Sequence, residues 1–138
     1  MSKLPTKNSN YLGVDFGGKR IGIARAGSIA KLAEPLTTLV VDGTEISRIL
    51  RLAEQEEAGV IVVGRPRGLD GQETDQTKLA TKFAEILQQA GLHVVMIDEA
   101  LTSKAAEGFL KTKHRPGWPH EDVDNIAAMI LLDDYLSQ

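Results

Sequence analysis

Hydrophobic and polar positions alternate along the first part of the chain. Residues 11–16 (YLGVDF) have the two-residue period of a strand with one face in the core, and Asp15 falls on the other face. The glycines at positions 17 and 18 favour a tight hairpin, and residues 21–24 are expected to form the returning strand. Residues 35–41, rich in Thr and Val, predict a third strand, so the chain should open with an antiparallel meander.

After residue 44 the spacing of hydrophobic positions changes to three and four residues. Residues 46–53 and 79–90 each carry one apolar stripe, which predicts two amphipathic helices. Residues 60–63 and 93–97 are short apolar runs, typical of strands that are covered on both faces. The apolar stripe expected to be buried by the second helix consists of Leu79, Phe83, Ile86, Leu87 and Ala90.

Four further segments complete the chain. Residues 64–71 (GRPRGLDG) predict a loop, because three glycines and a proline interrupt a strand. A third helix is expected from residue 102 or 103 to about residue 110, followed by a basic loop at 113–119 (KHRPGWP). The last helix is predicted from about residue 121 to residue 136, with Asp124 at the margin of its buried face. That face is expected to contain Val123, Ile126, Ala127, Ile130 and Leu131.

The order of these elements predicts an α/β fold. Strands separated by helices should be parallel through right-handed crossovers, whereas the opening meander is antiparallel. We therefore expect a mixed five-stranded sheet, with the antiparallel meander of strands 1, 2 and 3 joined by parallel strands 4 and 5 and with helices on both faces. Residues 1–10 are expected to be a flexible N-terminal tail and residues 11–138 a single domain.

The composition limits the classes of function. The chain has 138 residues, no Cys and a formal net charge of −3, which argues against a general polyanion binder. It has neither an apolar run of about 20 residues nor the apolar block of a signal peptide, so we expect a soluble, cytoplasmic protein. Residues 104–120 are basic and residues 121–138 acidic. That charge step suits a site for phosphate and metal ions, but ordinary solvated charge explains it equally well.

Three acids that are far apart in the sequence fall where this fold would bring them together. Asp15 and Glu99 lie near the ends of predicted strands, and Asp124 lies on the final helix. Carboxylates about 5 Å apart repel by roughly 3 kcal/mol per pair at an effective dielectric constant near 20, so three ionised together require a cation. Oxygen ligands favour Mg²⁺ or Mn²⁺, and such a site hydrolyses phosphodiester bonds. Taken alone, Asp15 could equally cap the hairpin turn.

Four sequence blocks resemble those of the YqgF-type nucleases of the ribonuclease H-like superfamily, which are named for precursor 16S ribosomal RNA and are related to Holliday junction resolvases. The blocks keep the family's order and spacing along almost the whole chain, and they are GVDFGGKRIGIA (13–24), GRPRGLDG (64–71), DEALTS (98–103) and VDNIAA (123–128). The resemblance implies a ribonuclease H-like fold and a metal-dependent endonuclease. It also implies that Asp15, Glu99 and Asp124 are the catalytic and metal-binding acids.

The resemblance further implies a substrate and a cofactor. These are the 5′ end of precursor 16S ribosomal RNA, free or on a ribosomal particle, and Mg²⁺ or Mn²⁺. Several positions depart from the family pattern, namely Gly18, Arg65, Gly68, Asn125 and Ala100. The most important is Ala100, which stands where an Arg usually follows the acid. We hypothesise that Arg65 or Arg67 supplies the missing charge to a phosphate.

Several other residues are candidates for nucleic-acid binding. Besides Arg65 and Arg67, they are Lys19, Arg20, Lys104, Lys113, Arg115 and Trp118. Trp118 could stack on an unpaired base while the basic residues around it hold the backbone, or it could simply pack its loop onto the domain. Charged hairpin tips are also commonplace. Asp98 is expected to support Glu99 or to cap the following helix.

Other functions remain open at this level. A DNA junction resolvase would use the same chemistry but needs two active sites, so the chain could be a monomer or a homodimer. Residues 15–18 (DFGG) also resemble the phosphate loop of actin-like sugar kinases, although those enzymes need two such domains around the nucleotide. A non-catalytic nucleic-acid-binding module is the last alternative.

Overall fold

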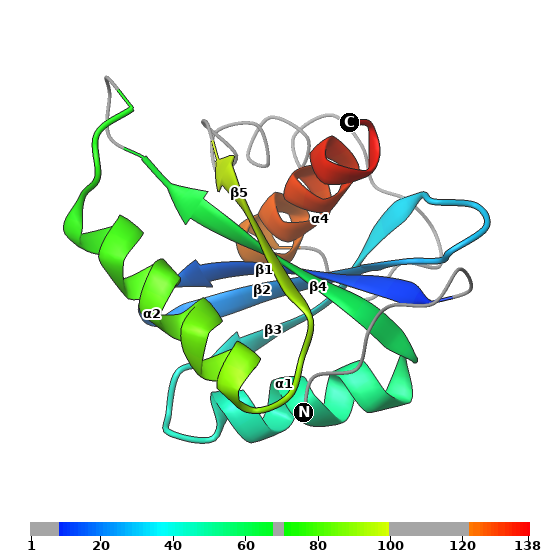
Figure 1. Ribbon diagram of the computed structural model, residues 1–138, viewed down its shortest axis with the longest axis horizontal. Coiled ribbons are helices and arrows are strands. Elements are labelled where there is room, and N and C mark those ends of the chain that lie inside the picture. Colours follow the sequence, from blue (N-terminus) through cyan, green and yellow to red (C-terminus); the bar gives the residue numbers. More distant parts are fainter. Residues whose placement is uncertain (1–8, 68–70, 100–121) are drawn as a thin grey trace.

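The computed structural model describes residues 9–67, 71–99 and 122–138 and contains five strands and three helices there (Figure 1). The strands are β1 (Asn10–Gly17), β2 (Arg20–Ala26), β3 (Ala33–Val40), β4 (Ala58–Pro66) and β5 (Val94–Glu99). The helices are α1 (Glu45–Gln55), α2 (Asp75–Gln89) and α4 (Val123–Leu136).

The five strands form one mixed sheet in the order β3-β2-β1-β4-β5. The β1–β2 and β2–β3 pairs are antiparallel, and the β1–β4 and β4–β5 pairs are parallel. This arrangement confirms the predicted α/β fold and its mixed sheet. Because β1, β4 and β5 run in the same direction, their carboxyl ends lie at one edge of the sheet, which is where parallel sheets usually place functional groups (Figure 1).

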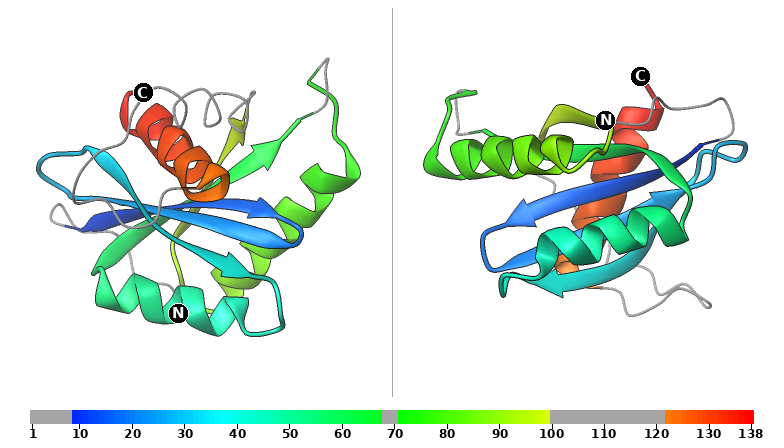
Figure 2. Two further views of the ribbon diagram at one scale, coloured as in Figure 1. Left: turned by 180° about the vertical axis from the view of Figure 1, so that it is seen from behind. Right: turned by 60° about the horizontal axis from the view of Figure 1, so that its bottom comes forward.

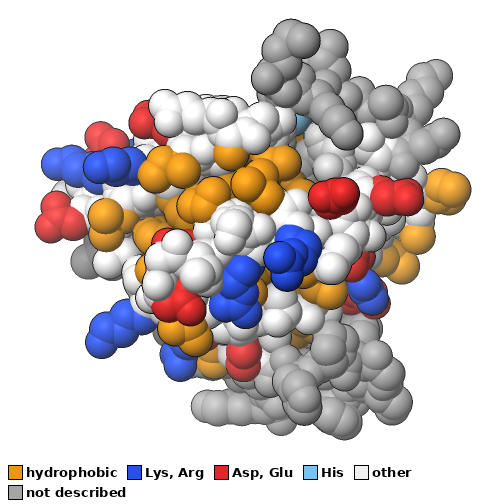
Figure 3. Space-filling view, turned by 90° about the horizontal axis from the view of Figure 1, so that it is seen from below, with side chains coloured by type: hydrophobic (Ala, Val, Ile, Leu, Met, Phe, Trp, Pro, Cys, Tyr) orange, Lys and Arg blue, Asp and Glu red, His pale blue; other side chains and the backbone are white. Residues whose placement is uncertain are grey.

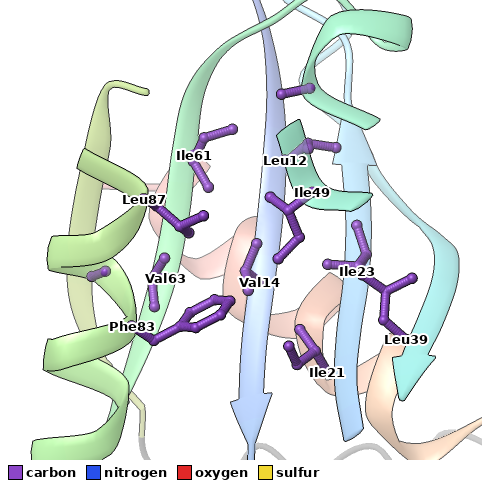
Figure 4. Close-up of a cluster of buried hydrophobic side chains, with 12 residues drawn as sticks. Leu12, Val14, Ile21, Ile23, Leu39, Ile49, Ile61, Val63, Phe83 and Leu87 are labelled. Atoms are coloured by element: carbon purple, nitrogen blue, oxygen red, sulfur yellow. The ribbon is translucent and has the colours of Figure 1, made fainter. Parts of the chain in front are cut away.

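Helices cover both faces of the sheet, as predicted. α1 and α2 lie on one face and α4 lies on the other (Figure 2). On the first face, Ile49 of α1 and Phe83 and Leu87 of α2 pack against side chains of β1, β2 and β4 (Figure 4). Phe83 stacks on Phe16 with 4.6 Å between ring centroids, which fixes the part of β1 that carries Asp15.

Close packing of α4 on the other face depends on Gly13 of β1. A Cβ at this position would lie 2.9 Å from both the Ala128 carbonyl oxygen and the Leu132 Cβ. The helix is buried more widely than one stripe, since Asn125, Ile126, Ala127, Ala128, Met129, Leu131 and Leu132 are all buried. The predicted inward residues Val123 and Ile130 are only partly buried against this cluster. The final helix therefore sits on the sheet as a core helix, with its first turn near the carboxyl end of β1.

β4 extends beyond the predicted strand, so the prediction that residue 64 begins a loop was wrong. Arg65 pairs with Asp98, and Pro66 pairs with Glu99. The pairing of β4 with β1 ends at Val63, so only β5 continues alongside. A strand with one free side tolerates a proline, because the missing N–H removes no ladder hydrogen bond there.

α2 is rotated relative to its predicted orientation, although Phe83 and Leu87 are buried as predicted. Its buried residues are Thr77, Ala80, Phe83, Ala84 and Leu87. Leu79 and Ile86 are instead 46% and 39% exposed, and hydrophobic side chains form a band among charged ones on the surface seen from below (Figure 3). The cause is at the start of the helix, where the Thr77 hydroxyl donates a hydrogen bond to the Pro66 carbonyl. That bond turns the helix face that carries Thr77, Ala80 and Ala84 towards the sheet.

Some predicted segments lie outside the described residues, namely the third helix at 102–110 and the basic loop at 113–119. Residues 1–8 of the predicted tail lie outside them too, and Asn10 is the first residue of β1. In the part of the chain that is described, no helix is long and apolar enough to cross a membrane.

Candidate active site

Asp15 lies in the central strand, on the face that α4 covers. Val14 is fully buried on the other face, so the side chain of Asp15 points towards the α4 side. Across the sheet Asp15 pairs with Gly22 of β2. On the β4 side, Gly64 directly follows Val63, the partner of Val14. Asp15 is therefore flanked on both sides by glycines, which leave space above the sheet for other groups.

Glu99 fills the space above Gly64. It is the last residue of β5, is 9% exposed, and a Cβ on Gly64 would lie 2.7 Å from its Cγ and Cδ. The strand alternation puts Glu99 on the α4 face, because Val95 and Ile97 pack against the α4 cluster. Its carboxyl group is hydrogen-bonded to that of Asp15.

Asp124 fills the space above Gly22. A Cβ on Gly22 would lie 1.8 Å from the Asp124 carbonyl oxygen, so the first turn of α4 rests directly on this glycine. The side chain of Asp124 is 24% exposed, and its Oδ2 is 3.0 Å from the Nε of Arg20 at the start of β2. Asp124 also acts electrostatically on Asp15. The sheet therefore brings all three predicted acids to one place.

The start of α4 is tied to β3. Asp122 is the N-cap, and its carboxylate accepts a hydrogen bond of 2.8 Å from the Asn125 backbone N–H. The Thr38 hydroxyl of β3 lies 2.9 and 2.8 Å from the two oxygens of the same carboxylate. Thr38 pairs with Gly22, so Asp15, Gly22 and Thr38 form one row across the meander. This row sets both the position of Asp15 and the position of the helix that carries Asp124.

The electrostatics of the cluster favour a proton or a cation. The pKa of Asp15 is raised to about 8, chiefly by burial and in addition by the charge of Glu99, the hydrogen bond with Glu99 and the charge of Asp124. A proton shared by Asp15 and Glu99 relieves their repulsion at neutral pH. A divalent cation would relieve it more completely, since it also offsets Asp124.

Within residues 9–67, 71–99 and 122–138, no three acidic, histidine or cysteine side chains form a group that could hold a metal ion. Asp15 and Glu99 are in contact, but the carboxylate of Asp124 is held by Arg20. The donor set consists only of carboxylate oxygens, which fits Mg²⁺ or Mn²⁺. The chemistry of this donor set therefore fits a divalent ion, which the Asp15–Glu99 pair would hold.

Residues 9–138 match the family model described as "RuvX: Holliday junction resolvase". The chain belongs to the RuvX family. This membership confirms the YqgF-type resemblance carried by the four sequence blocks.

Relatives of this RuvX-family chain include proteins named "Putative pre-16S rRNA nuclease". The one from Chloroflexus aurantiacus is 37% identical over 129 residues, which cover 91% of this chain and 84% of the relative. The one from Thermosynechococcus vestitus is 36% identical over 92% of this chain and 87% of the relative. The one from Rickettsia akari is 33% identical over 98% of this chain and 90% of the relative.

Solved structures with a similar fold include resolvases. RuvC of T. thermophilus in complex with a Holliday junction substrate has a TM-score of 0.56 at 17% identity, over 92% of this chain and 93% of that one. The fowlpox virus resolvase with its Holliday junction DNA has a TM-score of 0.55 at 13% identity, over 93% and 97%. At these identities the likeness establishes the ribonuclease H-like fold of this RuvX-family chain and nothing further.

The predicted basic residues have different surroundings. Arg20 contacts Asp124 at the acid cluster, and Lys19 lies beside it in the β1–β2 turn. Arg65 and Arg67 both contact Asp98, at 3.4 and 3.1 Å. Arg65 follows Val63 by two residues and therefore points to the α1/α2 face, opposite to Glu99. The remaining candidates lie outside the described residues, and they are Lys104, Lys113, Arg115 and Trp118.

The residues that sequence reasoning missed are those that position the acids. Gly22, Gly64, Thr38 and Asp122 were not singled out, although two of them are glycines inside predicted strands or at their ends. A glycine in a strand indicates close approach of another group, and this signal was available for Gly22. Thr38 and Asp122 are 84 residues apart, and no local pattern connects them.

A polar pocket of about 210 Å³ lies at the opposite end of β1 from Asp15. Its lining includes Arg25, which is paired with Glu34 at 2.6 Å and with Glu56 at 3.0 Å. Both carboxylates of this pocket are paired with Arg25, so among the described residues the acid cluster remains the candidate site for phosphodiester chemistry.

Proposed function

We propose that this chain is a metal-dependent endonuclease that hydrolyses phosphodiester bonds in structured nucleic acid. The observation that carries this proposal is the hydrogen-bonded Asp15–Glu99 pair beside Asp124, where the pKa of Asp15 is raised to about 8. Such repulsion between acids is a cost to the fold unless a ligand offsets it, and strongly raised carboxyl pKa values are typical of functional sites. Membership of the RuvX family supports the same activity.

In this mechanism Asp15 and Glu99 would hold the cation, and Asp124, which pairs with Arg20 here, would be the third ligand. A bound divalent cation supplies Lewis-acid assistance to the attack on the phosphodiester and to the departure of the leaving oxygen. Arg20 lies beside Asp124, where its guanidinium group would pair with a phosphate oxygen of the substrate. Gly22 and Gly64 leave room for Asp124 and Glu99, because a side chain on either glycine would occupy the space that these acids fill.

We propose precursor 16S ribosomal RNA as the substrate, cut at its 5′ end, with Mg²⁺ or Mn²⁺ as the cofactor and the cytoplasm as the location. The names of the relatives that are 33% to 37% identical to this chain support this choice of RNA. The acids that define the chemistry do not themselves distinguish RNA from DNA, because neither phosphodiester hydrolysis nor cation binding requires the 2′-hydroxyl.

The second candidate is a Holliday junction resolvase acting on DNA. It is favoured by the description of the family model and by the fold shared with two resolvases. A junction has two strands to be cut, so this activity requires a dimer with two acid clusters, whereas RNA processing does not.

A cleavage panel tests the proposal. Purified wild type, Glu99→Gln and the control Asp134→Asn, which changes an exposed acid of α4, are incubated with Mg²⁺ or Mn²⁺ and three substrates. These are RNA spanning the precursor 5′ end, the same RNA without the precursor segment, and a four-way DNA junction. We expect cleavage of the first substrate by wild type and control and at least a hundredfold slower cleavage by Glu99→Gln. Cleavage of the junction alone would favour the resolvase, and equal cleavage by all three proteins would exclude this site.

A further inference from the structure

Two arginines share one carboxylate oxygen at the carboxyl ends of β4 and β5. The Nε of Arg67 donates a hydrogen bond of 3.1 Å to Oδ1 of Asp98, and the Nε of Arg65 lies 3.4 Å from the same atom. In the described part of the chain, Asp98 is the only acid within ion-pair distance of either arginine. Within residues 9–67, 71–99 and 122–138, two guanidinium groups therefore face one carboxylate, which leaves one positive charge uncompensated by these residues.

The geometry of the cluster is incomplete. The Nε of Arg65 is buried and has no hydrogen-bond partner among the described residues, because 3.4 Å is too long for a good N–H···O bond. A buried donor without a partner costs free energy, of the order of 1–3 kcal/mol. Asp98, in contrast, has a side chain that is 62% exposed. A ligand with more acceptor oxygens than one carboxylate could satisfy both arginines and leave Asp98 in water.

The cluster lies at the same edge of the sheet as the acids but on the other face. Arg65 and Asp98 are paired residues on neighbouring strands, and Glu99, the next residue, points to the α4 side. Thr77 of α2 anchors the backbone between the two arginines through the Pro66 carbonyl. The cluster is therefore a fixed feature that is separated from the acids by the thickness of the sheet, and it would meet a phosphate other than the one being hydrolysed.

We propose that Arg65 and Arg67 form a phosphate-binding site for the nucleic-acid backbone, and that Asp98 occupies it in the free protein and is displaced when a phosphate binds. The identification of the anion as a nucleic-acid phosphate rests on the proposed function. A phosphate offers several acceptor oxygens to the two guanidinium forks, which is the geometry that arginine recognises best. Asp98 keeps the arginines in position and also weakens binding, because it must first be released.

Binding measured without cleavage tests this proposal. The probe is a short fluorescein-labelled single-stranded RNA, and EDTA is present throughout. Its binding is measured by fluorescence anisotropy at several salt concentrations. We expect Asp98→Asn to lower Kd about three- to tenfold and Arg65→Ala/Arg67→Ala to raise Kd about tenfold. The double arginine variant should also reduce the slope of log K against log salt by about 0.7 to 1.4, for one to two lost phosphate contacts.

The decisive comparison is a double-mutant cycle. The effect of Asp98→Asn should disappear when Arg65 and Arg67 are both alanine, because Asp98 then has no arginine to release. Glu73→Gln, which removes an exposed negative charge from the segment before α2, is the matched control and should change Kd less than twofold. The proposal is overturned if Asp98→Asn strengthens binding equally in both backgrounds, or no more than Glu73→Gln does.

A lysine variant distinguishes a loss of phosphate binding from a loss of folding. Arg65→Lys/Arg67→Lys retains both charges but lacks the guanidinium forks, so it should bind more weakly than wild type while melting at a similar temperature. Equal binding by the lysine variant and wild type would reduce the site to a general positive charge and contradict the proposal. Because EDTA prevents metal-dependent cleavage, loss of the coupling would leave the proposed nuclease intact, and loss of nuclease activity would leave the coupling intact.

Discussion

Gly22 lies directly beneath the backbone of Asp124. A Cβ placed on Gly22 would be 1.8 Å from the Asp124 carbonyl oxygen and 2.8 Å from the Asn125 backbone nitrogen. No heavy atom can approach that closely, so any side chain at position 22 must lift the first turn of α4 from the sheet. The acid on the helix and the acid on β1 are therefore neighbours because β2 has a glycine between them.

We predict that Gly22→Ala damages both the fold and the site. The methyl group meets backbone atoms, which cannot move away as a side chain can, so the free energy of unfolding should fall by at least about 2 kcal/mol. Urea denaturation followed by circular dichroism measures this. Gly27→Ala is the control, because nothing lies within 4 Å of a Cβ there, and it should change stability by less than about 0.5 kcal/mol. Equal stability of the two variants would contradict the packing described for α4.

Gly64→Ala should separate the site from the fold. The new methyl group would be 2.7 Å from the Cγ and Cδ of Glu99, which belong to a side chain and can rotate away. We expect a loss of stability below about 1.5 kcal/mol together with at least a tenfold loss of Mn²⁺ affinity, because Glu99 is pushed out of reach of Asp15. Isothermal titration calorimetry gives the affinity. Unchanged Mn²⁺ binding would show that Glu99 is not a ligand.

The raised pKa of Asp15 predicts an unusual pH dependence in the absence of metal. The folded protein keeps the proton up to a pKa of about 8, whereas the unfolded chain loses it near pH 4, so ionisation favours unfolding between these values. Stability should therefore fall as the pH rises from about 5 to about 8 and then level off. Asp15→Asn removes this slope and should be more stable than wild type at pH 8, by about 2 kcal/mol.

Denaturant titrations in EDTA at several pH values between 5 and 9 measure this difference. Asp134→Asn, an exposed acid on the same helix as Asp124, is the control and should follow the wild-type curve. If Asp15→Asn were less stable than wild type across this range, the carboxylates would not be in the repulsive contact described.

Thr38→Val should loosen the start of α4. Valine has the shape of threonine but cannot donate a hydrogen bond, so the Asp122 carboxylate loses a partner at 2.8 Å. We expect a loss of about 1–2 kcal/mol in stability and, because Asp124 lies in the same helical turn, weaker Mn²⁺ binding. Thr37→Val, on the other face of β3, is the matched control. A loss of stability equal in the two variants would argue that the hydrogen bond to Asp122 does not position the helix.

The sequence was sufficient to predict the sheet because its periods are local. The alternation around Asp15 and the apolar runs at 60–63 and 93–97 define strands by themselves, and the right-handed crossover rule then orders them. Asp15, Glu99 and Asp124 could be predicted to lie close together, because the first two are near strand ends and the third is on the final helix. These parts of the account depend on backbone direction, which the pattern of hydrophobic residues specifies well.

The remaining features depend on contacts between distant residues. The rotation of α2 is set by the bond from Thr77 to the Pro66 carbonyl, and the length of β4 is set by its one-sided pairing with β5. Neither has a signal in the local hydrophobic pattern. The side chains of Arg65 and Glu99 point to opposite faces of the sheet because β4 continues through Pro66. The predicted loop left the direction of Arg65 undefined.

In the proposed mechanism Asp15, Glu99 and Asp124 together hold a divalent cation, and a Mn²⁺ titration of thermal stability tests this site. Wild type, Asp15→Asn, Glu99→Gln, Asp124→Asn and the control Asp134→Asn are melted at pH 7.5 with increasing Mn²⁺. We expect wild type and Asp134→Asn to gain several degrees in Tm, with saturation, and each of the other three variants to lose most of this gain. A Tm that does not respond to Mn²⁺ in wild type, or responds equally in all five proteins, would contradict it.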